Sequence, residues 1–405
     1  MQSMYELPRL DFDGAVDADG HILEPPDLWE RYLEKSYRQR AIRIRKDERG
    51  LEYLELDGQQ SKLVRNGMPA GLGGMDLVGG LVPERERCGL DYVDNASFGA
   101  MDLKERLARL DMEGIDRVFL YPTLGVLWVA ECEDEDLTQA YLRAYNRWIV
   151  DFCSDSGGRL LPMAQLSLGD PQAAAAELRR AAAAGVVGFW VPPFAWSKKP
   201  LGHPDHAPVF EAASELGLPM GIHPTFEPKW AGPGRFGEMT SIRYTFFINV
   251  TAGDAVRHAF TSLFQFGVFD KFPALKVVVL ESGGSWIGYW LDRMDAVYAS
   301  PLGGSVALKE TPSFYFQRQC WISADPDERS LAAVMGVVGE DKFFWASDFP
   351  HPDHPPDYAD HLNRLAAGLG ENARRCLLGA NVLGAYGLAD SSPTDMLPKR
   401  QGTSS

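Results

Sequence analysis

The chain has 405 residues, of which 45% are hydrophobic and 24% are charged, so it is long enough to bury a large core. Its formal net charge of −16 argues against binding to nucleic acid or to anionic membranes, and it favours a soluble enzyme that acts on a small-molecule substrate. No apolar run approaches the roughly 20 residues of a membrane span, and the N-terminus lacks the pattern of a signal peptide. The five cysteines show no C-x-x-C spacing, so we expect a cytoplasmic protein with reduced cysteines.

The first part of the chain combines one expected strand with a long insertion. Residues 1–14 are polar and are expected to form an N-terminal arm, and residues 15–19 are expected to form the first strand. Residues 30–100 are interpreted as an insertion with a short helix, a hairpin and an irregular, glycine-rich segment. The hairpin is predicted because apolar and polar residues alternate over 41–45 and again over 51–56.

From residue 101 onward, amphipathic helical segments alternate with short apolar strands. Seven further strands are predicted, at 117–121, 160–165, 186–191, 219–223, 275–281, 319–323 and 343–348. Helices are predicted before them, at 103–112, 136–152, 171–184, 207–216, 255–266, 286–298 and 328–337, and after them at 357–367 and 371–386. Strict alternation predicts a parallel sheet, and eight such strands predict an α/β fold that closes as a (β/α)8 TIM barrel over residues 15–388. Residues 389–405 are expected to form a disordered tail.

Carboxylates and imidazoles stand at the ends of four of the expected strands. They are Asp19 and His21 on the first strand, His223 on the fifth, Glu281 on the sixth and Asp348 on the eighth. The carboxyl ends of all strands meet at one mouth of such a barrel, which is where active sites lie. His and Asp/Glu side chains that converge there are typical ligands of a divalent metal. Each residue taken singly also fits a turn, a helix cap or a core position, but four strand ends together favour a metal site.

The spacing of two residues between Asp17, Asp19 and His21 would place all three on one face of a strand. Asp19 and His21 lie further toward the carboxyl end, so we prefer them to Asp17 as ligands. Several nearby residues are candidates for a second metal, or for groups that orient the ligands: Glu24, Glu281, His351 and His354.

Aromatic residues also follow several strand ends. They could line a pocket that accepts a ring, or they could simply pack in the core: Trp128, Trp190, Phe194, Trp196, Phe226 and Trp230. The remaining histidines are expected to be structural or to lie on the surface: His203, His206, His258 and His361.

Four segments of the chain resemble the amidohydrolase superfamily, in the branch related to aminocarboxymuconate-semialdehyde decarboxylase (amidohydrolase family 2). The segments are 17–29, 216–224, 272–286 and 346–353. This resemblance implies a barrel with one divalent metal, whose ligands would be Asp19, His21, His223 and Asp348. The superfamily often carries His-x-His on its first strand and a His after its sixth. The residues here are Asp19-x-His21 and Glu281, which make the site more anionic and leave the identity and number of metal ions open.

Two catalytic functions follow as hypotheses. The first is hydrolysis or non-oxidative decarboxylation of a small organic acid or amide. The metal would activate the substrate or a water, Asp348 would act as acid and base, and Glu281 would be a second catalytic group. Zinc is the first expectation, with manganese or iron as alternatives. The second hypothesis is a dinuclear iron or manganese oxygenase on the same barrel, because the site is rich in oxygen ligands. A barrel without catalytic activity is disfavoured because barrel mouths are usually catalytic. A homodimer is also considered.

Overall fold

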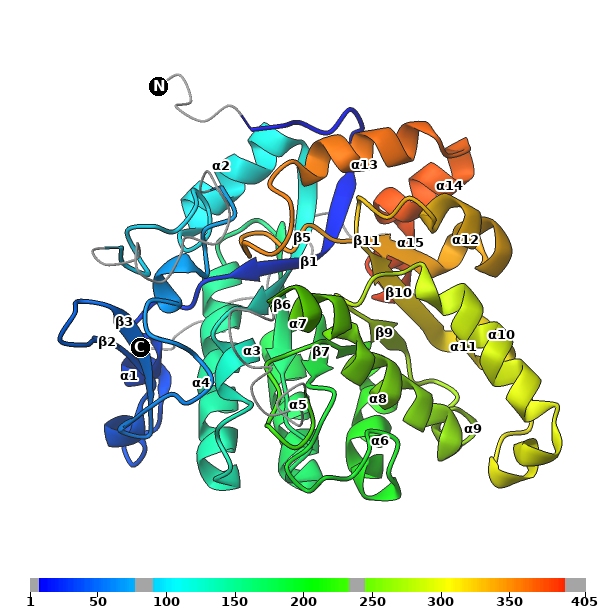
Figure 1. The fold of residues 1–405 in the computed structure, drawn as a ribbon, viewed down its shortest axis with the longest axis horizontal. Coiled ribbons are helices and arrows are strands. Elements are labelled where there is room, and N and C mark those ends of the chain that lie inside the picture. The colour runs from blue at the N-terminus through cyan, green and yellow to red at the C-terminus, as the bar shows by residue number, and fades with distance from the viewer. Residues whose placement is uncertain (1–6, 77–89, 233–244, 390–405) are drawn as a thin grey trace, which may run out of the picture.

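The structure of the protein is a computed structural model, which describes residues 7–76, 90–232 and 245–389. Eight parallel strands form one sheet in the order β1-β5-β6-β7-β8-β9-β10-β11. Their bounds are β1 (Ala15–Ile22), β5 (Ile115–Pro122), β6 (Leu160–Gln165), β7 (Gly188–Val191), β8 (Met220–Ile222), β9 (Val277–Val279), β10 (Cys320–Ala324) and β11 (Phe343–Trp345). Figure 1 shows these strands in the middle of the molecule with the long helices outside them. The predicted (β/α)8 barrel is confirmed.

The barrel is nearly closed between its first and last strands. The amide of Asp348 donates to the carbonyl of Asp19 at 3.0 Å, and the amide of His21 donates to the carbonyl of Phe349 at 2.7 Å. The residues that follow β11 therefore bind the end of β1, although the chain places them more than 300 residues apart. This closure brings the first and eighth strand ends to one place.

The long helices agree closely with the expected segments. They are α2 (Leu103–Glu113), α4 (Glu135–Cys153), α5 (Pro171–Ala184), α6 (Ala207–Leu216), α8 (Gly253–Gln265), α10 (Trp286–Tyr298), α12 (Leu331–Val338) and α13 (Tyr358–Ala367). Local sequence explains their ends. Asp170 caps α5 by accepting the amides of Gln172 and Ala173, Pro171 occupies the first turn, and Gly185 ends the helix at φ 112°.

The predicted helix at 371–386 is wrong as a single element. The structure divides it into α14 (Glu371–Arg375), a π-helical turn (Cys376–Ala380) and α15 (Asn381–Ala385). Gly379, inside this turn, has non-helical dihedral angles, and a Cβ there would lie 3.1 Å from the carbonyl oxygen of Gly14 and from Cγ2 of Val16. Close packing against the start of β1 accompanies the break, and no local sequence pattern signals that contact.

Four short helices were not anticipated. They are α3 (Gly125–Trp128), α7 (Thr245–Thr251), α9 (Val268–Lys271) and α11 (Pro312–Gln319). The first three have seven residues or fewer, which is too short for a hydrophobic period to show clearly in the sequence. Two of them, α3 and α7, follow strands at the mouth of the barrel.

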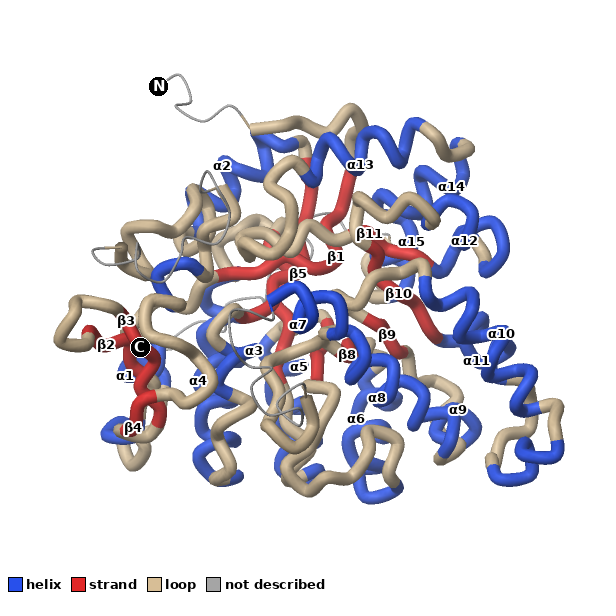
Figure 2. Tube along the Cα trace, viewed as in Figure 1, coloured by secondary structure: helices blue, strands red, loops and turns tan. Residues whose placement is uncertain are grey.

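The inserted segment forms a small layer beside the barrel (Figure 2). It contains α1 (Leu28–Tyr32) and an antiparallel sheet of β2 (Arg43–Lys46), β3 (Glu52–Leu56) and β4 (Gln59–Gln60). Leu54 of β3 is fully buried. The middle of the Gly-rich segment, 77–89, lies outside the described residues, as do 1–6 of the arm and 390–405 of the tail. The described part of the arm binds α2, because the amide of Leu10 donates to the carbonyl of Glu113 at 2.8 Å.

The described cysteines, Cys132, Cys153, Cys320 and Cys376, are free and buried; Cys88 lies outside the described residues. Within the described residues, no helix combines the length and the apolar character that crossing a membrane would require.

Candidate metal centre

Two histidines face one another at the mouth of the barrel, one on β1 and one directly after β8. The Nε2 atoms of His21 and His223 lie 3.2 Å apart. Nδ1 of His21 lies 2.8 Å from the carbonyl oxygen of Pro122, and Nδ1 of His223 lies 2.6 Å from that of Pro224. A carbonyl only accepts hydrogen bonds, so each Nδ1 carries a proton and each neutral ring has its lone pair on Nε2. Two lone pairs this close repel unless a proton or a metal cation lies between them.

Two carboxylates flank the histidine pair. Asp19 approaches both imidazoles, with Oδ1 at 3.6 Å from Nε2 of His21 and Oδ2 at 3.7 Å from Nε2 of His223. Glu281 approaches from the more accessible side, with Oε2 at 2.9 Å from Nε2 of His223. Both oxygens of Asp19 are buried, and they accept no hydrogen bond from any described residue. Such orphaned oxygens are costly without a balancing charge, so the donor set fits a divalent cation.

The ligand atoms of Asp19, His21, His223 and Glu281 all lie within 4.8 Å of one another. The structure thus brings three of the four predicted ligands together with Glu281, which we expected as a catalytic group or a second-metal ligand. The fourth predicted ligand, Asp348, adjoins this set through His21, because its Oδ1 lies 3.1 Å from Nε2 of that residue.

Asp348 belongs to a second group of close ligand atoms, with His21, Glu281 and His351. Nδ1 of His351 lies 3.1 Å from Oδ1 of Asp348, and Nδ1 of His354 lies 2.6 Å from its Oδ2. Two histidines of the same loop therefore contact the two carboxylate oxygens of Asp348 and limit its orientation.

The backbones of Glu281 and Asp348 are in the left-handed region, with φ of 37° and 52°. This region is unfavourable for residues other than glycine, and such strain is concentrated at functional sites. Glu281 lies two residues after the end of β9 and Asp348 three residues after the end of β11, so the turn redirects each side chain. Neighbouring groups hold the turn after β9: the amide of Glu281 donates to Oγ of Ser323 at 3.1 Å, and Glu328 accepts the amide of Gly284 at 2.6 Å.

Asp17 lies outside the metal cluster and joins the first and last strands. Its Oδ1 accepts the amide of Ser347 at 3.1 Å, and its Oδ2 accepts the hydroxyl of Ser347 at 2.5 Å. Burial raises the pKa of Asp17 to about 6. Arg106 of α2 donates to the carbonyl of His21 at 3.0 Å and places a buried charge near Asp17. Sequence reasoning missed Arg106, since an arginine on an amphipathic helix carries no signal of such a contact.

Glu24 also lies outside the groups of possible ligands among the described residues. Its carboxylate accepts three backbone amides of the loop after β5, from Thr123, Leu124 and Gly125, at 3.0, 2.7 and 2.9 Å. Thr123 in turn places Oγ1 at 3.1 Å from Nε2 of His351. Glu24 thus shapes a loop that orients His351, and burial raises its pKa to about 7.

A third group joins Asp348 to two residues of the following loop, Asp353 and His354. Nε2 of His354 also lies 3.7 Å from Oδ1 of Asp325, which follows β10. Asp353 and Asp325 were not identified from the sequence. Asp353 adjoins His354 in the chain, but Asp325 is brought near only by the neighbouring positions of β10 and β11.

The pKa values of His21 and His223 shift in opposite directions. Burial, reinforced by the charge of His351, lowers the pKa of His21 to about 3. Burial also lowers the pKa of His223, but the carboxylates of Glu281 and Asp19 outweigh it and raise the value to about 9. Burial raises the pKa of Asp348, yet His351 and His354 outweigh it and hold the pKa well below its usual range. In the metal-free site His21 is therefore neutral, while His223 takes up the proton that a cation would displace.

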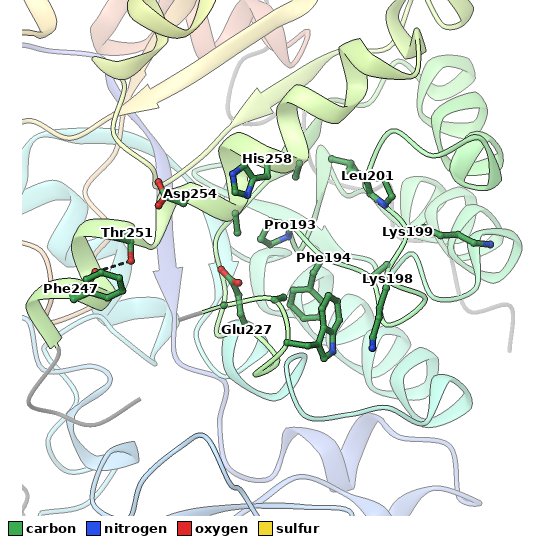
Figure 3. A pocket seen from close by; sticks show the side chains of 17 residues that line it. Pro193, Phe194, Lys198, Lys199, Leu201, Glu227, Phe247, Thr251, Asp254 and His258 are labelled. Carbon is green, nitrogen blue, oxygen red and sulfur yellow. Dashed lines mark hydrogen bonds between the residues drawn. The ribbon is translucent and has the colours of Figure 1, made fainter. Parts of the chain in front are cut away.

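A cavity of about 240 Å³ is lined by residues of the loops after β7 and β8 and of α7 and α8, and none of the described cluster residues lines it (Figure 3). Of the aromatic residues singled out in the sequence, Phe194 and Trp230 line this cavity, whereas Trp128 and Trp190 are fully buried in the core. His258, expected to be structural or on the surface, also lines the cavity.

The family model for amidohydrolases matches residues 100–388. Among curated relatives, a 2-amino-3-carboxymuconate-6-semialdehyde decarboxylase from Dictyostelium discoideum is 26% identical over 295 residues, which are 70% of this chain and 76% of the relative. A gamma-resorcylate decarboxylase from Polaromonas sp. is 24% identical over 298 residues, which are 65% of this chain and 82% of the relative.

Solved structures share the fold. An amidohydrolase from Mycobacterium avium subsp. paratuberculosis has a TM-score of 0.78 and 22% identity, over 94% of this chain and 99% of the other. A dihydroxybenzoic acid decarboxylase from Polaromonas sp., solved with manganese and 2-nitroresorcinol, has a TM-score of 0.65 and 17% identity, over 94% of this chain and 99% of the other. The region that the family model matches covers most of the barrel. The chain is therefore an enzyme of the amidohydrolase family, in its decarboxylase-related branch.

Proposed function

We propose that the protein catalyses the metal-dependent, non-oxidative decarboxylation of a small aromatic or unsaturated carboxylic acid. The observation that carries this proposal is the convergence of the His21 and His223 Nε2 atoms with two carboxylates at the barrel mouth. The names of the curated relatives support decarboxylation over hydrolysis, because both relatives described above are decarboxylases.

We propose Asp19, His21, His223 and Asp348 as metal ligands, with Glu281 as a fifth group that binds the metal or its substrate. A divalent cation held there would act as a Lewis acid on oxygen atoms of the substrate. Three carboxylates in the set favour a hard cation, and a fold neighbour contains manganese. Manganese is therefore a candidate equal to zinc.

In the proposed reaction, Asp348 takes a proton from water and delivers it to the substrate carbon, because its own carboxyl group is ionised at neutral pH. The bond between the ring or chain carbon and the carboxylate breaks, carbon dioxide leaves, and the electron pair left on carbon takes up a proton. Asp348 is 2% exposed, and its carboxylate is in contact with His21, His351 and His354. These contacts orient it for proton transfer at the metal site. Glu281, with 19% of its side chain exposed, lies where a substrate can reach it.

The test is to incubate manganese-loaded and zinc-loaded protein with 2,6-dihydroxybenzoate and 5-carboxyvanillate, and to measure carbon dioxide and the decarboxylated product. We expect metal-dependent release of carbon dioxide from at least one of these acids or a close analogue, without consumption of oxygen. Hydrolysis of aryl amides or esters, with no decarboxylation in a broad panel of acids, would contradict the proposal. Oxygen uptake by a protein with two irons per chain would favour the dinuclear oxygenase instead.

A further inference from the structure

Large apolar side chains are exposed on two neighbouring outer helices, α10 and α12. Tyr289 on α10 is 69% exposed, and Val337 near the end of α12 is 79% exposed. The helices pack together at Gly288, where an added Cβ would lie 3.4 Å from Cγ1 of Val334. Figure 1 shows both helices at the right-hand edge of the molecule. Tyr289 directly follows Gly288 in the chain, so α10 and α12 present one outer face with apolar side chains exposed on both helices.

The outer side of α12 is apolar although it faces solvent. The helix has the sequence Leu-Ala-Ala-Val-Met-Gly-Val-Val and contains no charged residue. Leu331 and Met335 are buried, whereas Ala332, Ala333 and Gly336 are exposed. A surface helix normally carries polar residues on its outer side, and a helix that is apolar all round is normally buried. The outer side of α12 is therefore typical of a helix that another protein surface covers.

The exposed side of α10 carries two opposite charges next to each other. Asp292 and Arg293 are exposed, and neither side chain forms an ion pair with another described residue. Tyr289 and the exposed Ala296 lie about one helical turn before and after them, on the same side of the helix. If a second copy of α10 crossed this one in the antiparallel direction, Asp292 of each copy would face Arg293 of the other. The charges of α10 are therefore complementary to themselves under twofold symmetry.

We propose that the face formed by α10 and α12 binds a second copy of this chain. The two α10 helices would cross antiparallel at Asp292 and Arg293, and Tyr289 and Val337 would be buried in the contact. Charge favours this occupant: the chain has a net charge of −16, so two copies repel one another over most of their surfaces. This face instead combines an uncharged helix with a balanced pair of charges. The inference does not depend on the proposed function.

Sedimentation equilibrium of the full chain over a range of concentrations tests the inference. We expect a dimer with a dissociation constant of about 1 µM or lower. Val337→Glu should raise this constant about 100-fold, because it introduces a carboxylate into the apolar contact on both sides of the twofold axis. Leu216→Glu, at the partly exposed end of α6, is the matched control and should leave the constant unchanged. Circular dichroism checks that each variant is folded.

Charge reversal tests the twofold arrangement separately. Asp292→Arg and Arg293→Asp should each weaken the dimer about ten-fold, because like charges then meet across the contact. An equimolar mixture of the two single variants should associate more tightly than either variant alone, since opposite charges meet again. Arg364→Asp, on the exposed side of α13, is the matched control.

Three results would overturn the inference. The first is an unmodified protein that stays monomeric at about 100 µM, far above the expected dissociation constant. The second is a dimer that Val337→Glu weakens no more than Leu216→Glu does. The third is a mixture of Asp292→Arg and Arg293→Asp that associates no better than the separate variants.

Discussion

His21 and His223 stand 202 positions apart in the chain, yet their Nε2 atoms lie 3.2 Å from each other. Each ring is fixed by the contact of its Nδ1 with a backbone carbonyl, so neither can turn its lone pair away without losing a buried hydrogen bond. This preorganised pair is the centre of the candidate metal site.

We expect metal binding to stabilise the protein. Binding to the folded state alone adds about 2.7 kcal/mol when the free metal is 100 times its Kd. Chelation should lower the melting temperature and abolish activity, and added manganese or zinc should restore both. His223→Ala should remove this metal-dependent shift, whereas His361→Ala should retain it, because His361 is partly exposed on α13 and belongs to none of the groups of possible ligands among the described residues. A shift that survives in His223→Ala would place the metal elsewhere.

Metal binding should release protons near neutral pH. His223 has a pKa of about 9 in the metal-free site, so it is protonated at pH 7 and must lose that proton to become a ligand. His21, with a pKa of about 3, is already neutral. The affinity for metal should therefore rise with pH up to about 9. Calorimetry in buffers of different ionisation enthalpy measures the released protons, and a pH-independent affinity between 6 and 8 would contradict this reading of the site.

Asp348→Asn should lower kcat by about 10²- to 10⁴-fold if the residue transfers a proton during the reaction. The asparagine keeps the size of the side chain but cannot exchange a proton in the same way. Asp357→Asn, on the surface nine residues later, serves as the control and should leave kcat unchanged. Metal content must be measured for both variants, because full activity in metal-loaded Asp348→Asn would exclude the acid–base role.

Glu24→Gln should destabilise the fold by about 1–3 kcal/mol, because one carboxylate satisfies three buried backbone amides. The side-chain NH2 group of a glutamine is a donor, so it cannot accept the hydrogen bonds of these backbone amides. The metal content should not change, since Glu24 shapes the loop after β5 instead of binding the ion. Denaturant unfolding measures the effect, with the exposed Glu30→Gln as control. Loss of metal by a folded Glu24→Gln protein would show that Glu24 is a ligand after all.

Ser347→Ala should cost about 1.5–3 kcal/mol of unfolding free energy, because it removes the hydroxyl that donates to the buried carboxylate of Asp17. The measurement belongs at pH 8, above the Asp17 pKa of about 6, so that the carboxylate is charged. Ser214→Ala, which removes only a hydroxyl bonded within α6, should change stability by less than about 0.5 kcal/mol. Equal effects of the two substitutions would show that the Asp17–Ser347 contact does not close the barrel.

Several features of the site depend on contacts that no local pattern reports. Asp17 and Asp19 belong to the same two-residue spacing in the sequence, which does not distinguish their roles. In the folded protein Ser347 binds the carboxylate of Asp17 and joins it to the last strand. The roles of Glu24 and Arg106 likewise follow from backbone groups that lie nearby only in the folded protein. The left-handed turns at Glu281 and Asp348 were also not foreseen, because nothing in the sequence around them requires a positive φ.

The sequence by itself determined the alternation of strands and helices, because hydrophobic periods and helix caps act over a few residues, and α6 and α10 match their expected bounds. It also located the acidic and imidazole residues at strand ends, since their order follows directly from that alternation. The tertiary structure alone decided which of them meet. Closure of the sheet sets distances between residues hundreds of positions apart, so it assigned Asp17 and Glu24 to structural contacts and brought Glu281 beside His223.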